Sequence, residues 1–150
     1  MRIVHLSAEY FPEALVLWEA SVRATHHFLP DGWIEKYRLK VLTEYFPMVE
    51  MYGVFNDSKE LLGFSGVHNH NLEMLFVHPK QIGKGVGSAL VKHAIQNLNV
   101  TKVDVNEQNK EALTFYLSQG FQVQSRSEFD AQGNPMPLLH LSLTKNKKID

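Results

Sequence analysis

The sequence predicts an α/β (α+β) fold in which about four helices flank a mixed central sheet of about six to seven strands. Three observations support this class. The middle of the chain has the pattern of a buried strand, a glycine-spaced loop and an amphipathic helix. Strand-type and helix-type apolar periodicities follow one another in the order β-α-α-β-β-β-α-β-α-β-β. No repeat or linker interrupts the 150 residues, so residues 1–150 are predicted to form a single domain.

The N-terminal part of the chain predicts one strand and two helices. Residues 2–6 alternate weakly as a strand does, and Ser7 can cap a helix whose stripe runs on to His26. Asp31 can cap a second helix, which Pro47 ends. The apolar residues expected to face the core are Phe11, Leu15, Trp18 and Val22 in the first helix, and Ile34, Tyr37, Val41 and Tyr45 in the second.

The next strands lead to the centre of the sheet. Residues 48–55 and 61–68 are predicted to form a hairpin, and the turn 68–71 enters a central strand over 72–77. Pro79 then ends the ladder because it lacks an N–H. The central strand is apolar on both faces, with Leu72, Met74 and Phe76 expected on one and Leu75 and Val77 on the other.

A glycine-rich loop follows this strand and opens the helix predicted over residues 86–98. Gly83, Gly85 and Gly87 allow bare backbone to approach a ligand, and free N–H groups at the positive end of the helix dipole suit a phosphate. Lys84 adds a charge, although the spacing is neither G-x-G-x-x-G nor that of a P-loop. The remaining elements are a strand over 100–105, a helix over 110–119 stopped by Gly120, and a strand pair over 121–126 and 137–143.

Composition excludes several classes of partner and site. Fifteen basic and sixteen acidic residues provide no net field for nucleic acid or an anionic membrane. The absence of cysteine excludes disulfides, a thiolate nucleophile and cysteine-based zinc sites. With no signal-peptide pattern and no apolar run of membrane length, the protein is expected to be cytoplasmic. Residues 145–150 are expected to form a flexible tail.

Two motifs resemble signatures of the GCN5-related N-acetyltransferase (GNAT) family. The first is the run of strand, V-x-P, x-x-G-K-G-x-G and helix within Leu72–Leu98. The second is the block N-x-x-A-x-x-x-Y-x-x-x-G-F that begins at Asn109. With the order of elements, the resemblance covers nearly the whole chain. It implies the GNAT fold and acetyl transfer from acetyl-CoA without a metal.

The resemblance also implies how acetyl-CoA is held. In that family the loop amides hold the CoA pyrophosphate, the preceding strand pairs with the pantetheine arm, and the asparagine bonds to the arm. Ile82 stands where the family has Gln or Arg, whereas Gln81 lies one position earlier. The implied cofactor-binding residues are Leu75, Phe76, Val77, Ile82, Gly83, Lys84, Gly85, Val86, Gly87, Ser88 and Asn109.

Tyr116 is implied as the acid that protonates the departing thiolate. It lies seven residues after Asn109, two turns along the same helix face. A phenol, with an ordinary pKa of about 10, is a sensible acid for this step. The alternative is that Asn109 only caps the helix and Tyr116 only packs against Ala112 and Leu113.

Glu73 is the candidate base, because it lies on the central strand toward the side of Leu75 and Val77. Half-buried there, its carboxylate would be a better base near neutral pH. Many members of the family have an acid near this strand that takes a proton from the amine, often through water. The alternative is that Glu73 marks a solvated edge at the start of the strand.

Four residues are predicted to bind the acceptor: His26, Phe28, Trp33 and His70. His26 lies in VRATHHFLP, which resembles a segment that covers the acceptor site in small bacterial members of the family. The alternative is a histidine favoured by the helix dipole. His68 and His70 would share a face of a strand, as a zinc site requires, but no third ligand stands out and no metal is expected.

The sequence therefore predicts an N-acetyltransferase that passes acetyl directly from acetyl-CoA to a primary amine. The aromatic residues Phe28, Trp33, Tyr37 and Tyr45 suggest a lid over a small-molecule pocket. Acetylation of a peptide N-terminus or protein lysine is an alternative, as is a CoA-binding regulatory module without turnover. A monomer or homodimer is expected, with neither nucleic acid nor membrane as a partner.

Overall fold

A computed structural model describes residues 1–144, and the tail predicted for residues 145–150 lies outside the described residues. The elements follow the predicted order, with the second helix built from three joined segments. Short 3-10 turns form η1 and η3, and η2 is a π-helical turn. In chain order the elements are β1 (Arg2–His5), η1 (Ala8–Tyr10), α1 (Phe11–Thr25), α2 (Trp33–Lys40), η2 (Val41–Tyr45), α3 (Phe46–Met48), β2 (Glu50–Phe55), β3 (Leu61–His68), β4 (Asn71–Val77), η3 (Pro79–Gln81), α4 (Val86–Leu98), β5 (Lys102–Asn106), α5 (Lys110–Ser118), β6 (Phe121–Ser127) and β7 (Leu138–Leu143).

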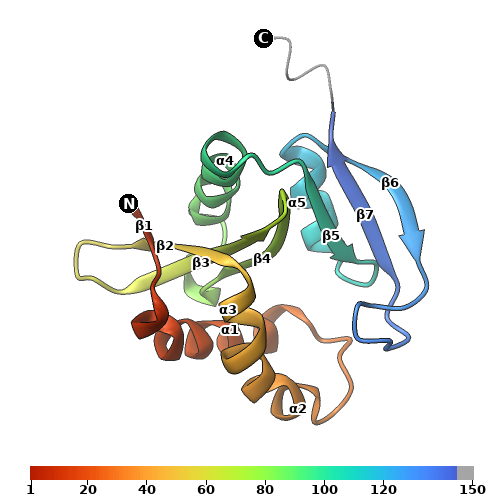
Figure 1. Ribbon diagram of the computed structural model, residues 1–150, viewed down its shortest axis with the longest axis horizontal. Helices are drawn as coiled ribbons and strands as arrows, with labels where there is room; N and C mark the ends of the chain where they lie inside the picture. Colours follow the sequence, from red (N-terminus) through yellow and green to blue (C-terminus); the bar gives the residue numbers. More distant parts are fainter. Residues whose placement is uncertain (145–150) are drawn as a thin grey trace.

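One mixed sheet of seven strands, in the order β1-β2-β3-β4-β5-β7-β6, organises the molecule (Figure 1). Every neighbouring pair is antiparallel except β4 and β5, which are parallel. That parallel pair is joined only at Asn71 with Lys102 and at Leu72 with Val103. Beyond Leu72 the two strands separate, so a seam opens between the two halves of the sheet.

A β-bulge lies in β4 next to this seam. Val67 of β3 pairs with Leu72, whereas Gly66 pairs with Met74, so Glu73 is the extra residue. Leu72 therefore packs in the cluster beneath α4 and α5, whereas Met74 packs against the cluster beneath α1. The prediction that Leu72 shares a face with Met74 is wrong, because simple alternation does not survive a bulge.

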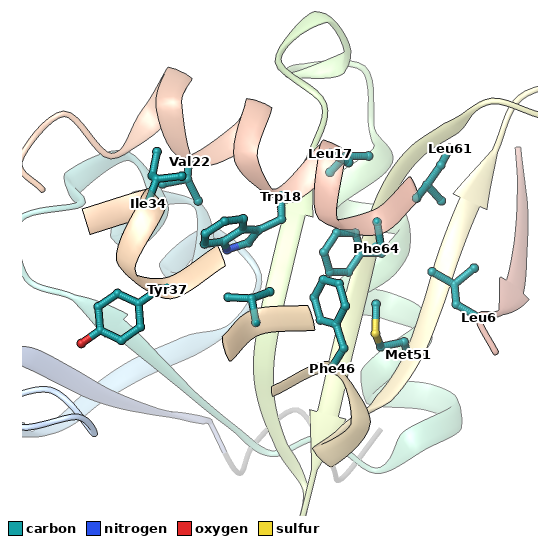
Figure 2. Packing of buried hydrophobic residues seen from close by; sticks show 12 residues of the cluster. Leu6, Leu17, Trp18, Val22, Ile34, Tyr37, Phe46, Met51, Leu61 and Phe64 are labelled. Atoms are coloured by element: carbon teal, nitrogen blue, oxygen red, sulfur yellow. The ribbon is translucent and has the colours of Figure 1, made fainter. Parts of the chain in front are cut away.

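Two main apolar clusters stabilise the two halves of the sheet. The first joins α1, α2 and α3 to β2 and β3, with Trp18, Phe46 and Phe64 at its centre (Figure 2). The second joins α4 and α5 to the far strands, and it includes Val91 and Phe121. Helices thus cover both faces of the sheet near the seam, as an α/β fold requires.

The N-terminal helices depart from the prediction in detail. The buried residues of α1 include the small Ala14 and Ser21, while Phe11 and Leu15 are only partly buried. Gly32, with a φ of 79°, occupies the N-cap of α2 in place of Asp31. The second helical stretch ends at Met48, one residue beyond Pro47. Proline is tolerated there because a missing N–H costs nothing in a first turn.

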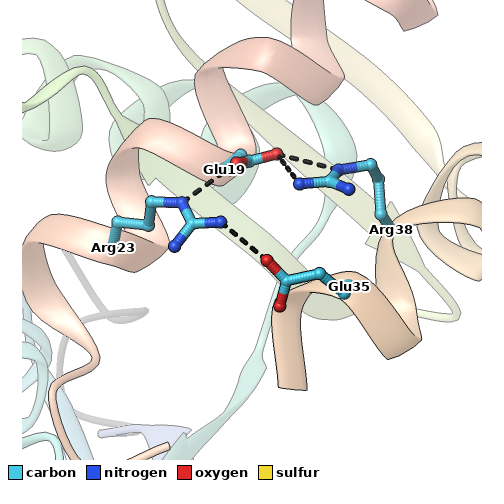
Figure 3. Close-up of polar contacts among 4 residues, drawn as sticks. All are labelled: Glu19, Arg23, Glu35 and Arg38. Carbon is cyan, nitrogen blue, oxygen red and sulfur yellow. Dashed lines mark hydrogen bonds and ion pairs between the residues drawn. The ribbon is translucent and has the colours of Figure 1, made fainter. Parts of the chain in front are cut away.

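An ion-pair network joins α1 to α2 on the surface (Figure 3). Glu19 accepts from Arg38 at 2.7 Å and from Arg23 at 2.9 Å, and Arg23 also reaches Glu35 at 3.0 Å. The guanidiniums, Arg38 first, hold the pKa of Glu19 below its usual value. Because the pairs are exposed, solvent screens them and each contributes little to stability. The network's main effect is to fix how α2 lies against α1.

Candidate active site

A cleft of about 530 Å³ lies at the seam and is lined by β4, the glycine loop, α4, α5 and the end of α1. It contains the predicted acid, Tyr116, and most of the predicted cofactor-binding residues. Lys84 and Val86 do not line it. The predicted cofactor-binding residues that do are Leu75, Phe76, Val77, Ile82, Gly83, Gly85, Gly87, Ser88 and Asn109.

The glycine loop is built for backbone contacts. Gly83 and Gly85 have φ values of 82° and 89°, which side chains other than glycine rarely adopt. Gly85 is the N-cap of α4, so the N–H groups of Val86, Gly87 and Ser88 lie in the first turn without helical partners. These free donors at the positive end of the helix fit a phosphate group.

The other side chains of the loop have separate roles. The side chain of Val86 is buried in the core behind the loop. Only the backbone N–H of this residue is available at the start of the helix. Lys84 is exposed and lies outside the cleft lining. Ile82 is 56% exposed on the rim, beside Gln81, which also lines the cleft. A Cβ at Gly87 would meet Cζ of Phe115 at 3.4 Å, so this glycine keeps the helix close to the aromatic wall.

Tyr116 presents its hydroxyl to the cleft without a protein partner. The residue is 8% exposed, and its ring packs edge-on against Phe115 and Phe121. Within residues 1–144 the hydroxyl makes no hydrogen bond, so its proton is free for a ligand. Burial raises the pKa of the phenol above its ordinary value of about 10, so the hydroxyl is protonated at neutral pH and holds its proton more tightly than a free phenol does. The ring therefore packs against two aromatic residues other than the Ala112 and Leu113 expected, while the hydroxyl is available to a ligand.

Asn109 and His26 are joined by a chain of polar contacts whose direction can be deduced. Thr25 donates its one hydroxyl proton to the Ser21 carbonyl at 2.7 Å, so it can only accept from His26 Nδ1 at 2.8 Å. The neutral ring then has its lone pair on Nε2, 3.4 Å from Asn109 Nδ2. Asn109 Oδ1 accepts from the N–H of Ala112, which agrees with this orientation of the amide. His26 Nε2 therefore accepts from Asn109 Nδ2, and the two side chains meet in the wall of the cleft.

His26 should make folding stability sensitive to mild acid. Burial, with a smaller contribution from His27, lowers the pKa of His26 from 6.5 to about 4. The unfolded chain thus binds more protons than the native state between these values, and stability is lost as the pH falls through them. The loss should reach about 2 kcal/mol between pH 7 and pH 5. Urea unfolding of wild type and His26→Gln at both pH values checks this, since an equal loss in both would exclude His26 as its source.

Glu73 is exposed, and the half-buried position expected for it is wrong. As the extra residue of the bulge it leaves the apolar face, and its carboxylate accepts from Asn71 Nδ2 at 2.8 Å. It lines a second hollow, of about 470 Å³, together with Lys102 and Asp104. Val103 and Val105 face α4 and α5. Lys102 and Asp104 alternate with them along β5, so these two residues lie on the opposite face of the sheet.

Two other predicted acceptor residues, Phe28 and Trp33, line a third cavity of about 370 Å³. Trp33 stacks on Tyr37 with ring centroids 4.6 Å apart, and its buried indole N–H has no partner in the described chain. The hydroxyl of Tyr37 accepts from Asn134 Nδ2 at 2.9 Å, which ties α2 to the β6–β7 loop. The cavity therefore lies between these two segments, beside the seam.

His70 does not join these residues. It occupies the β3–β4 turn with a φ of 65°, and its Nδ1 lies 3.0 Å from the carbonyl of Asn99. The expectation that His68 and His70 share one face of a strand is wrong, because the chain reverses between them. No group of three or more possible metal ligands occurs within the part of the chain that the structure describes.

The cleft also contains residues that the sequence analysis did not name as site residues. Ser21 could have been suspected, since a polar residue at a buried helix position needs a reason, but the others carry no distinct signal. No helix among residues 1–144 is long and apolar enough to span a membrane. The additional lining residues are Ser21, Thr25, Gln81, Glu111, Ala112 and Phe115.

An opened parallel strand pair beside free helix N–H groups fits one class of protein, the acetyl-CoA-dependent acyltransferases. Comparison with known proteins agrees with this class. Residues 20–139 match the family model described as acetyltransferase (GNAT) domain. The chain therefore belongs to the GNAT family, and it is an N-acetyltransferase that transfers acetyl from acetyl-CoA to a primary amine.

Relatives with names and solved structures are similar to the chain over most of its length. Peptidyl-lysine N-acetyltransferase YjaB of Salmonella typhimurium is 35% identical over 85% of this chain and 87% of its own. YjaB of Escherichia coli K12 is also 35% identical, over 87% and 88%. The solution structure of apo YjaB from Escherichia coli has a TM-score of 0.85 at 34% identity, covering 95% of this chain and 97% of that one. PaiA N-acetyltransferase of Thermoplasma acidophilum, solved in complex with coenzyme A, shares the fold at 19% identity and a TM-score of 0.73, over 96% of this chain and 100% of that one.

Proposed function

We propose that the amine acceptor is the side chain of a lysine in a peptide or protein. The observation that carries this is the 35% identity, over most of the chain, to relatives named peptidyl-lysine N-acetyltransferase. The acceptor side of the seam supports it, because Glu73 lies exposed in a polar hollow rather than in a closed pocket. An exposed carboxylate can reach an ammonium on a polypeptide surface. The lysine alternative is thus favoured over the small-molecule amine.

The cleft residues would hold acetyl-CoA through backbone and amide donors. The N–H groups of Val86, Gly87 and Ser88 would receive the pyrophosphate, and Asn109 Nδ2 would bond to the pantetheine arm. The backbone of Leu75 at the seam would face the acyl end. When bound, acetyl-CoA supplies a thioester whose carbonyl an amine can attack.

Two side chains would carry out the proton transfers. A lysine ammonium has a pKa of about 10.4, so near neutral pH the acceptor must lose a proton before it can attack. Glu73 would take this proton, directly or through water, because it lies in β4 at the start of the seam. Tyr116 would give its phenolic proton to the departing sulfur from inside the cleft. The two groups lie in different hollows, which separates the base from the acid.

Release of free thiol from acetyl-CoA tests the acceptor. The panel comprises a lysine peptide with its N-terminus blocked, the same peptide with arginine for lysine and a free N-terminus, and simple alkyl diamines. Turnover with the blocked lysine peptide alone is the expected result. Turnover only with the free N-terminus, or only with the diamines, would overturn the proposed acceptor and leave the enzyme class intact.

Glu73→Gln should lower turnover with the lysine peptide by about 10²-fold and flatten the acidic limb of its pH–rate profile. The change removes the charge at nearly constant volume, and an exposed site should tolerate it. His70→Ala is the matched control, because His70 lies three residues before Glu73 in the chain but lines neither the cleft nor the hollow of Glu73. His26→Ala is expected to reduce turnover less than Glu73→Gln. If the acidic limb persists in Glu73→Gln and disappears in a histidine variant, that histidine is the base.

A further inference from the structure

Three side chains on the open face of the far half of the sheet form a hydrogen-bonded chain outside the acetyl-CoA cleft. His140 Nδ1 lies 2.7 Å from Asp104 Oδ1, and His140 Nε2 lies 2.6 Å from Ser127 Oγ. Asp104 is on β5, His140 on β7 and Ser127 at the end of β6. The order of contacts is that of a carboxylate, an imidazole and a hydroxyl in a nucleophilic triad.

The direction of these hydrogen bonds follows from their donors. The Asp104 carboxylate can only accept, so Nδ1 of His140 carries a proton. In the neutral imidazole Nε2 then has the lone pair, and Ser127 must donate its hydroxyl proton to it. The oxygen of Ser127 is left with both lone pairs free. The ring is thus oriented for general-base activation of a serine.

A second β-bulge places Ser127 on this face. Val123 pairs with Leu141, whose side chain is buried beneath the helices, while Ser125 pairs with His140. Gln124 is the extra residue. Each side chain after it therefore lies on the opposite face of the sheet from the one that strict alternation would give it. Ser125 and Ser127 therefore lie on the face of His140 and Asp104 rather than on the helical side. Without the bulge the hydroxyl could not reach the imidazole.

A hollow lies beside the carboxylate and imidazole of this chain, whereas Ser127 is not among the residues that line it. Asp104 and His140 line the hollow of about 470 Å³, together with Ser125. Ser127 is half-buried, and the side chains of Asp104 and His140 are 41% and 33% exposed. Glu73, Lys102 and His68 border the same hollow from β4, β5 and β3. No role in N-acetyl transfer requires Ser127.

We propose that Ser127 is an activated nucleophile that attacks small carboxylic esters, on the same face of the sheet as the hollow of Glu73. Ser127 Oγ attacks the ester carbonyl carbon while its proton passes to His140 Nε2, and Asp104 stabilises the resulting imidazolium. The bond to the leaving alkoxide breaks, and that oxygen takes the proton from His140. Water, deprotonated by His140, then cleaves the acyl-serine to release the carboxylic acid and restore the hydroxyl. Every proton returns to its starting group, and the cycle needs no oxidant or reductant.

A fluorophosphonate probe followed by peptide mass spectrometry tests the proposal on the full-length protein. Wild type should be labelled on Ser127, and His140→Gln should lower the labelling rate by about 10²-fold, the usual contribution of a general base. Asp104→Asn should also slow it, because the ring loses its orienting partner. Ser125→Ala is the matched control, since Ser125 lies on the same face and is more exposed but has no bond to His140. It should be labelled at the wild-type rate.

Release of p-nitrophenol from p-nitrophenyl acetate supplies the second measurement, with Ser127→Ala as the inactive variant. Far-UV circular dichroism and acetyl-CoA binding show that each variant is folded, since the cleft uses other residues. Absence of label on Ser127 in wild type overturns the proposal. So does labelling of Ser127 at an unchanged rate in folded His140→Gln. A failure of lysine acetylation would leave this result unaffected, so the two proposals are tested separately.

Discussion

Replacing Gly87 by glutamate is expected to weaken acetyl-CoA binding by at least about 10²-fold. The side chain would enter the first turn of α4, where the free N–H groups lie, and bring a negative charge to the position that a phosphate would take. Two like charges about 4 Å apart at a protein surface repel by about 4 kcal/mol, and each 1.4 kcal/mol corresponds to a tenfold change in affinity. Isothermal titration calorimetry with acetyl-CoA measures the loss.

The same substitution should leave the fold intact, which separates the two possible causes of failure. Gly87 has an ordinary helical backbone, and a negative charge at a helix N-terminus is favourable. Gly87→Gln is the matched control, because it adds the same volume against Phe115 without the charge. It should bind acetyl-CoA more tightly than Gly87→Glu. Equal affinities in the two variants would show that the loop does not receive the pyrophosphate.

Removal of the Tyr116 hydroxyl is expected to lower turnover by about 10²-fold or more while affinity for acetyl-CoA is retained. The phenol makes no hydrogen bond within the described residues, so Tyr116→Phe leaves no protein group without a partner. The ring keeps its contacts with Phe115 and Phe121. The melting temperature should therefore stay constant or rise slightly. Steady-state thiol release and thermal unfolding measure the two quantities.

Tyr52→Phe is the control for this prediction. Tyr52 lies on β2, where its hydroxyl is 3.5 Å from Glu50 and its ring stacks on His93, outside the cleft. Its removal should not change turnover. A Tyr116→Phe enzyme with wild-type turnover would reduce Tyr116 to a packing residue, and the thiolate would then take its proton from solvent.

The order of elements could be predicted from the sequence because each has a strong local signal. Residues 86–98 show a helical stripe, and helix α4 has those bounds. Gly120, with a φ of 102°, follows α5 as expected of a helix stop. Buried strands, paired hairpins and glycine stops depend on residues near one another in the chain. Such features can therefore be predicted from the sequence without knowing how distant segments pair.

The bulges could not be predicted, and the wrong expectations follow from them. An extra residue in a strand depends on how two distant segments pair, as Gly66 does with Met74. Strict alternation therefore placed Glu73 beside apolar neighbours, although it is exposed. It also gave no reason to connect Ser127 with His140, which lie thirteen residues apart. The glycine loop and Asn109, which line the cleft, could be proposed as site residues because their signal is local or resembles a family motif.

The two-residue junction between β4 and β5 has a consequence for how the enzyme survives in solution. Few main-chain bonds join the two halves directly, and the apolar cluster beneath α4 and α5, which includes Val67 and Leu72, supplies most of the packing across the junction. A donor molecule bound between the halves would add further contacts to both. At a concentration a hundred times its dissociation constant, such a molecule adds about 2.7 kcal/mol to the free energy of unfolding by mass action. The stability of the native enzyme then depends on the concentration of acetyl-CoA, its own acetyl donor.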